Sequence, residues 1–191
     1  MTDIDIVNKA LLKLGQAPVT SLAEDNERAF AANCIYESVR DFVMSSYRWN
    51  FAVKRITLMP CEEKPDFGFA FKYHLPPYFL RLLSLPDAPD NATDDYSIEG
   101  GFLLTDYSAP LNVIYLAKIT DTELYPAYFV ETLACKLAFE LCERLKQDPS
   151  RKNTLMQEYM FSISQAKKCN AIQMAAQRMP VSKLISTRFG Y

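Results

Sequence analysis

The chain has 191 residues, of which 49% are hydrophobic and 23% charged, a composition that is ordinary for a soluble globular protein. Its formal net charge of −2 gives no reason to expect nucleic-acid binding from the total charge. No apolar run approaches the roughly 18 residues of a membrane span, and the N-terminus lacks the basic and apolar regions of a signal peptide. We therefore expect one folded domain, made in the cytoplasm.

Two helices are predicted near the N-terminus, over residues 2–15 and 25–48, because apolar residues recur there at three- and four-residue steps. The predicted buried face of the second helix comprises Ala29, Ala32, Ile35, Tyr36, Val39, Phe42, Val43 and Ser46. Its charged residues, Glu27, Arg28, Glu37, Arg40 and Asp41, are expected mostly on the opposite, exposed side. Trp49, the only tryptophan, is expected in the core where this helix ends.

The pattern changes to strands over residues 51–118. Residues 51–59 alternate like a half-buried strand, 60–72 are expected to form a loop, and 79–85 and 112–117 are further strand candidates. Residues 96–99 and 102–105 flank Gly100-Gly101, which predicts a hairpin with a type I′ turn, since glycine tolerates a positive φ. Four or five short strands predict an antiparallel sheet or ribbon between helical segments.

Helical periodicity returns over residues 126–146 and 149–174, the second helix beginning at Asp148-Pro149, an N-cap followed by proline. The predicted fold class is α+β and mainly helical: a four-helix bundle with an inserted small antiparallel β lobe. Residues 1–174 form the single domain of this prediction, and residues 175–191 form a separate C-terminal tail.

Residue types suited to catalysis are sparse. The five glycines lie at positions 15, 68, 100, 101 and 190, which excludes a Walker A loop and a dinucleotide fingerprint. His74 is the only histidine and is expected at or near the surface. The five cysteines form no Cys-x-x-Cys pair and are predicted to be reduced thiols. We expect no metal, no cofactor and no enzymatic activity.

A series of short motifs resembles one protein family. The motifs include Ala-Leu-Leu-Lys-Leu-Gly ending at Gly15, Tyr36-Glu37-x-x-Arg40-Asp41, Arg48-Trp49-Asn50-Phe51-Ala52, Tyr73-x-Leu75-Pro76-x-x-Phe79-Leu80-Arg81-Leu82, Ile98-Glu99-Gly100-Gly101-x-Leu103-Leu104-Thr105-Asp106 and Ile119-Thr120-Asp121. In this order and spacing, the chain resembles the tail tubular protein A family, the head-to-tail adaptor (connector) proteins of short-tailed bacteriophages and prophages. The resemblance covers nearly the whole chain except about its last fifteen residues.

The resemblance implies a structural protein of the virion. Its subunits would form a ring, typically dodecameric, under the portal protein, and would extend the DNA channel without binding DNA specifically. The ring would also offer a platform to the next tail protein, a nozzle or tube component.

Charge is unevenly distributed along the chain. Between Ser84 and Ala117 there are six acidic residues and no lysine or arginine. These residues are Asp87, Asp90, Asp94, Asp95, Glu99 and Asp106. An acidic wall keeps contacts with phosphates weak, so this segment suits either the lumen of a DNA channel or a loop that faces the tail partner. A solvated outer edge explains it equally well.

The C-terminal tail mixes basic and apolar residues and is too short to fold alone. Under the resemblance it docks on the portal ring and gains order there; a frayed end without function is the alternative. The predicted portal-binding residues are Arg178, Lys183, Leu184, Ile185, Arg188, Phe189 and Tyr191.

A second function remains open from the sequence. Glu99 and Asp106 flank the predicted hairpin and offer two carboxylates, the groups that glycoside hydrolysis requires. Some tail accessory proteins that this chain resembles have been linked to peptidoglycan cleavage. The alternative is therefore a peptidoglycan-cleaving tail accessory protein.

Overall fold

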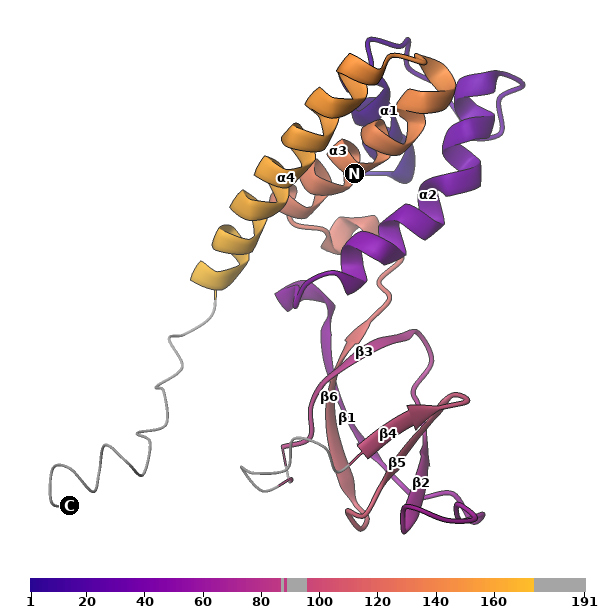
Figure 1. Ribbon diagram of the computed structural model, residues 1–191, viewed down its shortest axis with the longest axis vertical. Helices are drawn as coiled ribbons and strands as arrows, with labels where there is room; N and C mark the ends of the chain where they lie inside the picture. The colour runs from indigo at the N-terminus through magenta and orange to yellow at the C-terminus, as the bar shows by residue number, and fades with distance from the viewer. Residues whose placement is uncertain (87, 89–95, 174–191) are drawn as a thin grey trace, which may run out of the picture.

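The computed structural model describes residues 1–86, 88 and 96–173, which form a helical part and a β part joined end to end (Figure 1). The helical part contains α1 (Asp3–Lys13), α2 (Glu27–Ser45), α3 (Ala127–Leu145) and α4 (Pro149–Ile172). The β part lies between α2 and α3 in sequence and contains β1 (Val53–Leu58), β2 (Phe71–His74), β3 (Phe79–Ser84), β4 (Tyr96–Glu99), β5 (Phe102–Thr105) and β6 (Leu111–Ala117). Two short 3₁₀ turns, η1 (Asn50–Ala52) and η2 (Thr122–Leu124), lie at the junctions.

The helix starts follow from local capping. Thr2 and Asp5 form a capping box at the start of α1, in which each side chain bonds the other residue's backbone N–H. Asn26 caps α2 by accepting the backbone N–H of Ala29, and Asp148 caps α4 just before Pro149. These side chains satisfy N–H groups that have no partner within the helix.

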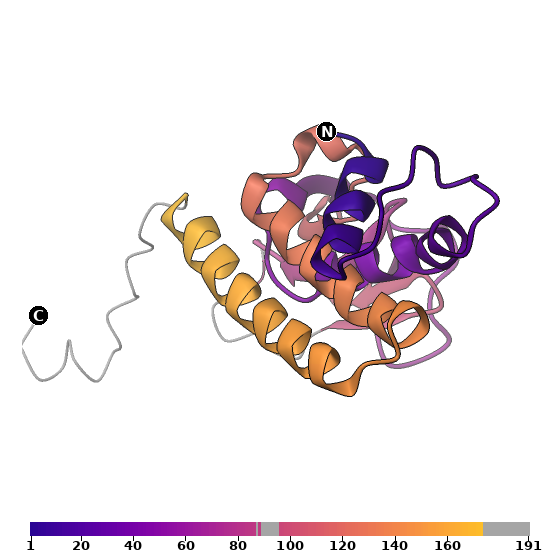
Figure 2. The same ribbon diagram turned by 90° about the horizontal axis from the view of Figure 1, so that it is seen from above.

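Helix α3 is the centre of the helical part, because it is the main packing partner of α1, α2 and α4. Seen from above, α3 lies between α4 on one side and α2 on the other (Figure 2). Its fully or nearly fully buried side chains are Phe129, Val130, Thr132, Leu133, Ala134, Cys135, Leu137, Ala138, Leu141 and Cys142. None of the helices described has the length and hydropathy needed to cross a membrane.

The β part consists of two antiparallel sheets of three strands each within the described residues. One sheet has the order β1-β6-β3, and the other has the order β2-β5-β4. Strand β6 is the central strand of the first sheet and is buried at every position except Asn112. Gly100 and Gly101 connect β4 to β5 with φ values of 56° and 85°, which confirms the predicted hairpin with positive φ at both turn residues.

The predicted four-helix bundle with a small β lobe is wrong. The fold is a mixed α+β arrangement in which three helices pack around α3, and the β part holds two sheets rather than one. Strand β2 falls partly in the segment predicted as a loop and pairs with β5. Helical periodicity identifies which face of a helix is apolar, but it does not specify the partner of that face.

Two predictions for α2 are also wrong. Phe42, expected in the core, is 55% exposed, whereas Arg40, expected at the surface, is only 3% exposed. Asp41 accepts a hydrogen bond from the Arg40 Nε at 2.9 Å, and the Arg40 guanidinium lies 5.9 Å from the ring centroid of Tyr36. Asp41 also pairs with Lys118, the residue after β6, at 2.8 Å. Asp41 therefore links the end of α2 to the β part, and the burial of Arg40 depends on tertiary packing that the helical pattern alone does not predict.

The joint between the two parts is built on Trp49, and its predicted burial is confirmed because the side chain is fully buried. Its indole Nε1 donates a hydrogen bond to the Val43 carbonyl at 2.9 Å, so the polar atom is satisfied. Its ring packs against Tyr128 and Phe129 of α3, with centroids 6.1 and 5.4 Å away. Trp49 thus links the end of α2 to the start of α3.

Asn170, near the end of α4, ties that helix to the same joint. Its side-chain oxygen accepts the backbone N–H of Asn50 at 2.8 Å, and its side-chain nitrogen donates to the Arg48 carbonyl at 2.9 Å. The Asn50 side chain donates in turn to the Asn170 carbonyl at 2.8 Å. Both α2 and α4 therefore run toward the β part and end at the joint, as Figure 1 shows.

Candidate functional site

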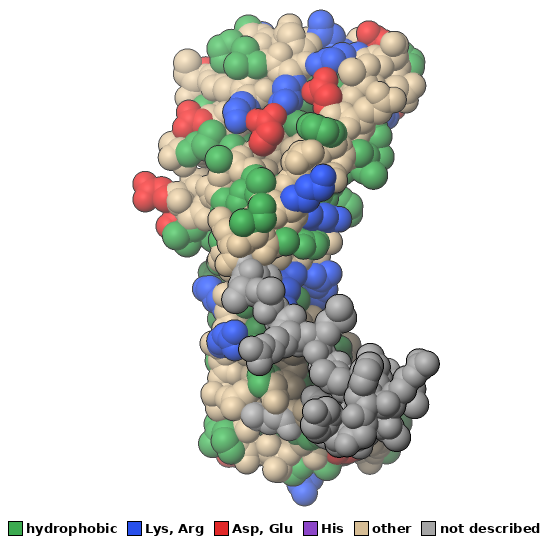
Figure 3. Space-filling view, turned by 90° about the vertical axis from the view of Figure 1, so that its left-hand side faces the viewer, with side chains coloured by type: hydrophobic (Ala, Val, Ile, Leu, Met, Phe, Trp, Pro, Cys, Tyr) green, Lys and Arg blue, Asp and Glu red, His purple; other side chains and the backbone are tan. Residues whose placement is uncertain are grey.

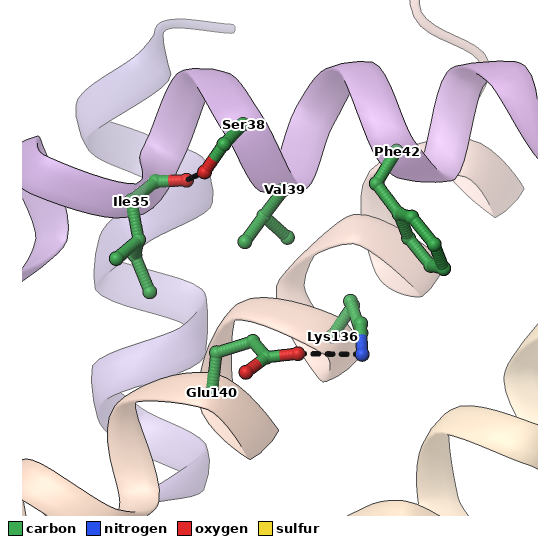
Figure 4. A pocket seen from close by; sticks show the side chains of 6 residues that line it. All are labelled: Ile35, Ser38, Val39, Phe42, Lys136 and Glu140. Atoms are coloured by element: carbon green, nitrogen blue, oxygen red, sulfur yellow. Dashed lines mark hydrogen bonds and ion pairs between the residues drawn. The ribbon is translucent and has the colours of Figure 1, made fainter.

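An open groove lies between α2 and α3 on the surface of the helical part (Figure 4). Its volume is about 240 Å³, and it is lined by Ile35, Ser38, Val39 and Phe42 of α2 and by Lys136 and Glu140 of α3. We call it the Lys136 groove. Most of its lining is apolar, with one lysine and one glutamate among the side chains.

Lys136 lies at the floor of this groove with its side chain only 14% exposed. Its ammonium group pairs with Glu140 one turn later on α3, at 2.6 Å. It also lies 5.2 Å from the ring centroid of Phe42, 4.8 Å from Phe139 and 5.4 Å from Tyr159 on α4. A carboxylate and three aromatic faces thus compensate the positive charge of Lys136 and hold its side chain at the floor of the groove.

A stripe of uncharged side chains borders the groove along the outside of α2. Phe30, Cys34, Ser38 and Phe42 recur every four residues, so they lie on neighbouring turns of one side of the helix, and all four are exposed. We call them the α2 stripe. Its aromatic members, Phe30 and Phe42, are 57% and 55% exposed. Exposed phenylalanines on one helix side are unusual for a surface that meets only water.

The outer face of α4 is also uncharged. Its exposed positions within residues 153–166 are Asn153, Thr154, Met156, Gln157, Met160, Phe161, Ser164 and Gln165, which we call the α4 ridge. Met160 and Phe161 are 55% and 67% exposed. Figure 3 faces this side of the molecule and shows hydrophobic side chains at the surface of the helical part. Depletion of charge, with enrichment in methionine and aromatic residues, is typical of the centre of a protein–protein interface.

The other side of α3 carries an ion-pair cluster. Glu131 pairs with Lys9 and Lys13 of α1 at 2.8 and 2.6 Å. Burial acts to raise the pKa of Glu131, but the hydrogen bonds from Lys13 and Lys9 outweigh it and lower the pKa to about 2. Neighbouring Cys135 is buried, and this burial raises the pKa of its thiol. The cluster therefore fastens α1 to α3 with ionised groups, and its cysteine is a poor nucleophile.

The two described members of the predicted acidic loop, Glu99 and Asp106, do not form a carboxylate pair. Glu99 is opposite Phe102 at one end of β5, and Asp106 follows Thr105 at the other end. Asp106 follows Phe102, the partner of Glu99, by four residues, which is about 14 Å along a strand at 3.4 Å per residue. The two carboxyl groups of a glycoside hydrolase lie only roughly 5 to 10 Å apart. The spacing therefore does not suit the predicted glycosidase site.

Both carboxylates have local structural partners instead. The side chain of Asp106 accepts the backbone N–H of Ala70 at 2.9 Å, which holds the segment before β2 against the end of β5. Glu99 accepts a hydrogen bond from the Ser97 hydroxyl at 2.6 Å. These bonds stabilise the second sheet at its edges.

The remaining predicted site residues lie outside the described part of the chain. They are Asp87, Asp90, Asp94 and Asp95 of the acidic segment and Arg178, Lys183, Leu184, Ile185, Arg188, Phe189 and Tyr191 of the tail. His74 is exposed, as predicted, and lies beside Phe102. All five cysteines are free thiols. The described residues contain no group of three side chains suited to holding a metal ion.

The sequence prediction missed both the α4 ridge and the Lys136 groove. A signal for the ridge is present, since residues 153–166 contain Glu158 as their only charged residue. That signal was hidden because apolar residues occupy both sides of α4: Met156 is 40% exposed, while Tyr159 is buried. The groove has no signal in the sequence because two helices that lie far apart in the chain build it.

A comparison with models of known protein families finds no match to this chain, and a comparison with curated protein sequences finds none either. The resemblance to head-to-tail adaptors therefore stays a prediction that depends on the motifs themselves. The exposed apolar side chains of the helical part are observed in the structure and do not depend on that resemblance.

Proposed function

We propose that this protein is a structural virion protein, a head-to-tail adaptor whose copies form a ring under the portal protein of a bacteriophage or prophage. The ring, which we expect to be dodecameric, extends the DNA channel and carries the nozzle or tube protein on its far side. DNA passes through without sequence-specific binding, and the protein has no catalytic role. It is made in the host cytoplasm and then built into the neck of the virion.

The observation that carries this proposal is the unusual surface of the helical part. The α2 stripe and the α4 ridge expose Phe30, Phe42, Met160 and Phe161, which are each more than half exposed. Large apolar side chains gathered on uncharged helix faces favour protein contacts over catalysis or nucleic-acid binding. The order of motifs shared with the adaptor family points to the same kind of function from the sequence.

The experiment mixes the full chain with its cognate portal ring and measures mass by light scattering on a sizing column, followed by negative-stain electron microscopy. We expect a discrete complex that carries an added ring on one face of the portal. Deletion of residues 177–191 should abolish it, because the tail is the proposed portal contact. A full chain that does not bind an intact portal ring would contradict the adaptor function.

The peptidoglycan-cleaving alternative has no geometric support. Its only candidate carboxylates, Glu99 and Asp106, lie at opposite ends of a strand and bond to their own sheet. We therefore do not propose a lytic activity.

A further inference from the structure

We propose that one face of the first sheet, β1-β6-β3, binds the phosphate backbone of double-stranded DNA through Arg55 and Arg81. This inference rests on the proposed function, in which copies of the chain surround a DNA channel, and it identifies the face that contacts the DNA. The contact is with phosphates and carries no sequence preference.

Basic residues are separated from acidic ones where the two parts of the molecule meet. Four segments build the first sheet and the joint, and they contain seven lysine or arginine residues and no aspartate or glutamate. The segments are residues 42–61, 75–86, 107–120 and 159–173. Their basic residues are Arg48, Lys54, Arg55, Arg81, Lys118, Lys167 and Lys168. The net charge of −2 hides this separation, because the acidic residues lie in other segments.

The register of the first sheet places Arg55 and Arg81 on the same face. Arg55 on β1 is opposite Ile114 of β6, and Arg81 on β3 is opposite Leu116 of the same strand. Ile114 and Leu116 are two residues apart, so their side chains and those opposite them share one face of the sheet. Both arginines are exposed, and neither has an ion-pair partner in the part of the chain that the structure describes. We call this surface the basic face.

The separation of the two arginines fits a row of phosphates. Two strand spacings of about 4.8 Å, combined with a register offset of two residues, place their Cα atoms about 12 Å apart. A double helix carries phosphates at regular intervals along both backbones, so each guanidinium can bind a different phosphate. The spacing therefore favours an extended polyanion over a single small phosphate compound.

An open groove on the basic face adds neutral polar groups. Its volume is about 350 Å³, and Arg55, Thr57, Asn112 and Ile114 are among the residues that line it. The Thr57 hydroxyl donates a hydrogen bond to the Asn112 side-chain oxygen at 2.7 Å. Ser84 on β3 is opposite Ile114 and is exposed. Serine, threonine and asparagine, together with arginine and lysine, are the residue types that contact DNA phosphates.

The chemistry of the basic face favours DNA over an acidic protein partner. Its central apolar residues, Ile114 and Leu116, are buried, so the exposed part is basic and polar. Protein–protein interfaces have an apolar and aromatic centre, whereas protein–DNA interfaces are polar and positively charged. The α2 stripe and the α4 ridge have the first composition, and the basic face has the second.

Further basic residues lie at the joint, next to the start of β1. Lys167 of α4 lies 5.3 Å from the ring centroid of Tyr47, and Arg48 follows Tyr47 in the chain. Neither Lys167 nor Arg48 has an ion-pair partner among the described residues. Figure 3 shows lysine and arginine side chains at the level where the two parts meet. Their positive potential adds to the attraction of a DNA backbone.

Fluorescence anisotropy with a labelled duplex of about 30 base pairs, at about 50 mM salt, tests the contact. The full chain should bind two duplexes of unrelated sequence equally well, with an affinity that falls as salt rises. Arg55→Gln should lower the affinity about fivefold and reduce the slope of log K against log salt by about 1. Arg55→Gln/Arg81→Gln should lower the affinity about 25-fold and reduce the slope by about 2, since the two sites are separate.

Two further variants make the test specific. Arg144→Gln removes the same charge from a side chain that is 53% exposed near the end of α3, away from the joint, and should bind like the wild type. Arg55→Lys should keep most of the affinity, because a phosphate contact depends mainly on the positive charge. Circular dichroism confirms that each variant is folded.

Three results would overturn the proposal. The first is a folded chain that does not bind the duplex at low salt, either alone or mounted on the portal ring. The second is an equal loss in Arg144→Gln and Arg55→Gln, which would show that net charge and not this face is responsible. The third is binding of poly-glutamate as tight as that of the duplex, which would indicate an acidic protein partner.

The portal-binding experiment separates this inference from the proposed function. If the portal complex forms but the duplex does not bind, the adaptor function stands and only the assignment of the basic face is wrong. If the duplex binds but no portal complex forms, the adaptor function fails while the phosphate-binding face stands.

Discussion

The helical part and the β part are stabilised in different ways. In the helical part, α3 buries ten residues and is surrounded by three other helices. In the β part, β6 is the only strand buried along most of its length among the described residues, and β1 is exposed at four of its six positions. All the salt bridges described involve the helical part except that between Lys72 and Glu63. A deep core around one helix tolerates little change, whereas thin sheets depend on turns and edge contacts.

The two parts are therefore suited to different roles in the proposed function. The helical part holds the α2 stripe and the α4 ridge on helices that pack against α3, which suits the protein contacts of the proposed function. The β part places loops at the other end of the molecule, where sequence changes cost less stability. The joint at Trp49 and Asn170 connects them, and the sole tryptophan therefore reports directly on its integrity.

The largest expected effect is in the core of the helical part. Leu133→Ala should lower the free energy of unfolding by about 2 to 5 kcal/mol, because Leu133 is fully buried in α3 and its removal leaves a cavity. Leu104→Ala, the same change at a half-buried position of β5, should cost about 1 kcal/mol or less. Urea unfolding followed by Trp49 fluorescence and circular dichroism measures both. Equal losses would contradict the contrast between the two parts.

The next effect concerns the joint. Asn170→Ala should lower the free energy of unfolding by about 1 to 3 kcal/mol, because it leaves the Asn50 N–H and the Arg48 carbonyl without their partner. Asn153→Ala is the control, since Asn153 is an exposed residue on the same helix. If the two variants unfold at the same urea concentration, Asn170 does not hold α4 to the joint.

A smaller effect is expected at the hairpin of the second sheet. Gly101 has a φ of 85°, so Gly101→Ala should cost about 1 kcal/mol through backbone strain, with no steric clash because nothing lies within 4 Å of the added Cβ. Gly101→Asn should cost less, because asparagine tolerates positive φ. Hydrogen exchange of β4 and β5 shows whether the loss stays in this sheet. A loss spread over α3 would indicate that the two parts unfold as one unit.

The smallest effect depends on pH. The folded-state pKa of Glu131 is lowered from 4.5 to about 2, so its ion pairs contribute stability above pH 4.5 that is lost as pH falls toward 2. The side chain is 40% exposed, and after solvent screening the contribution is about 1 kcal/mol. Glu131→Gln should therefore lower Tm at neutral pH and approach wild type near pH 2. Glu123→Gln, at an exposed position in η2, serves as the control; a difference in Tm that does not depend on pH would refute the role of the ion pairs.

The sequence by itself determined the local elements. Helix positions follow from apolar periodicity and from capping residues such as Asp148, and the β4–β5 hairpin follows from Gly100-Gly101. Burial of Trp49 follows from its size and its place between a helix and a strand. These features depend on residues close together in the chain, so a single sequence contains the information.

Only the tertiary structure decided which faces meet. Arg40 is buried while Phe42 stays exposed, and β2 joins β5 in a second sheet, because distant segments supply the packing partners. The separation of Glu99 from Asp106 follows from the register of β4 and β5, and the Lys136 groove follows from the packing of α2 against α3. Periodicity records that a helix has an apolar side, but whether that side enters the core or stays free for another copy depends on the packing of the whole chain.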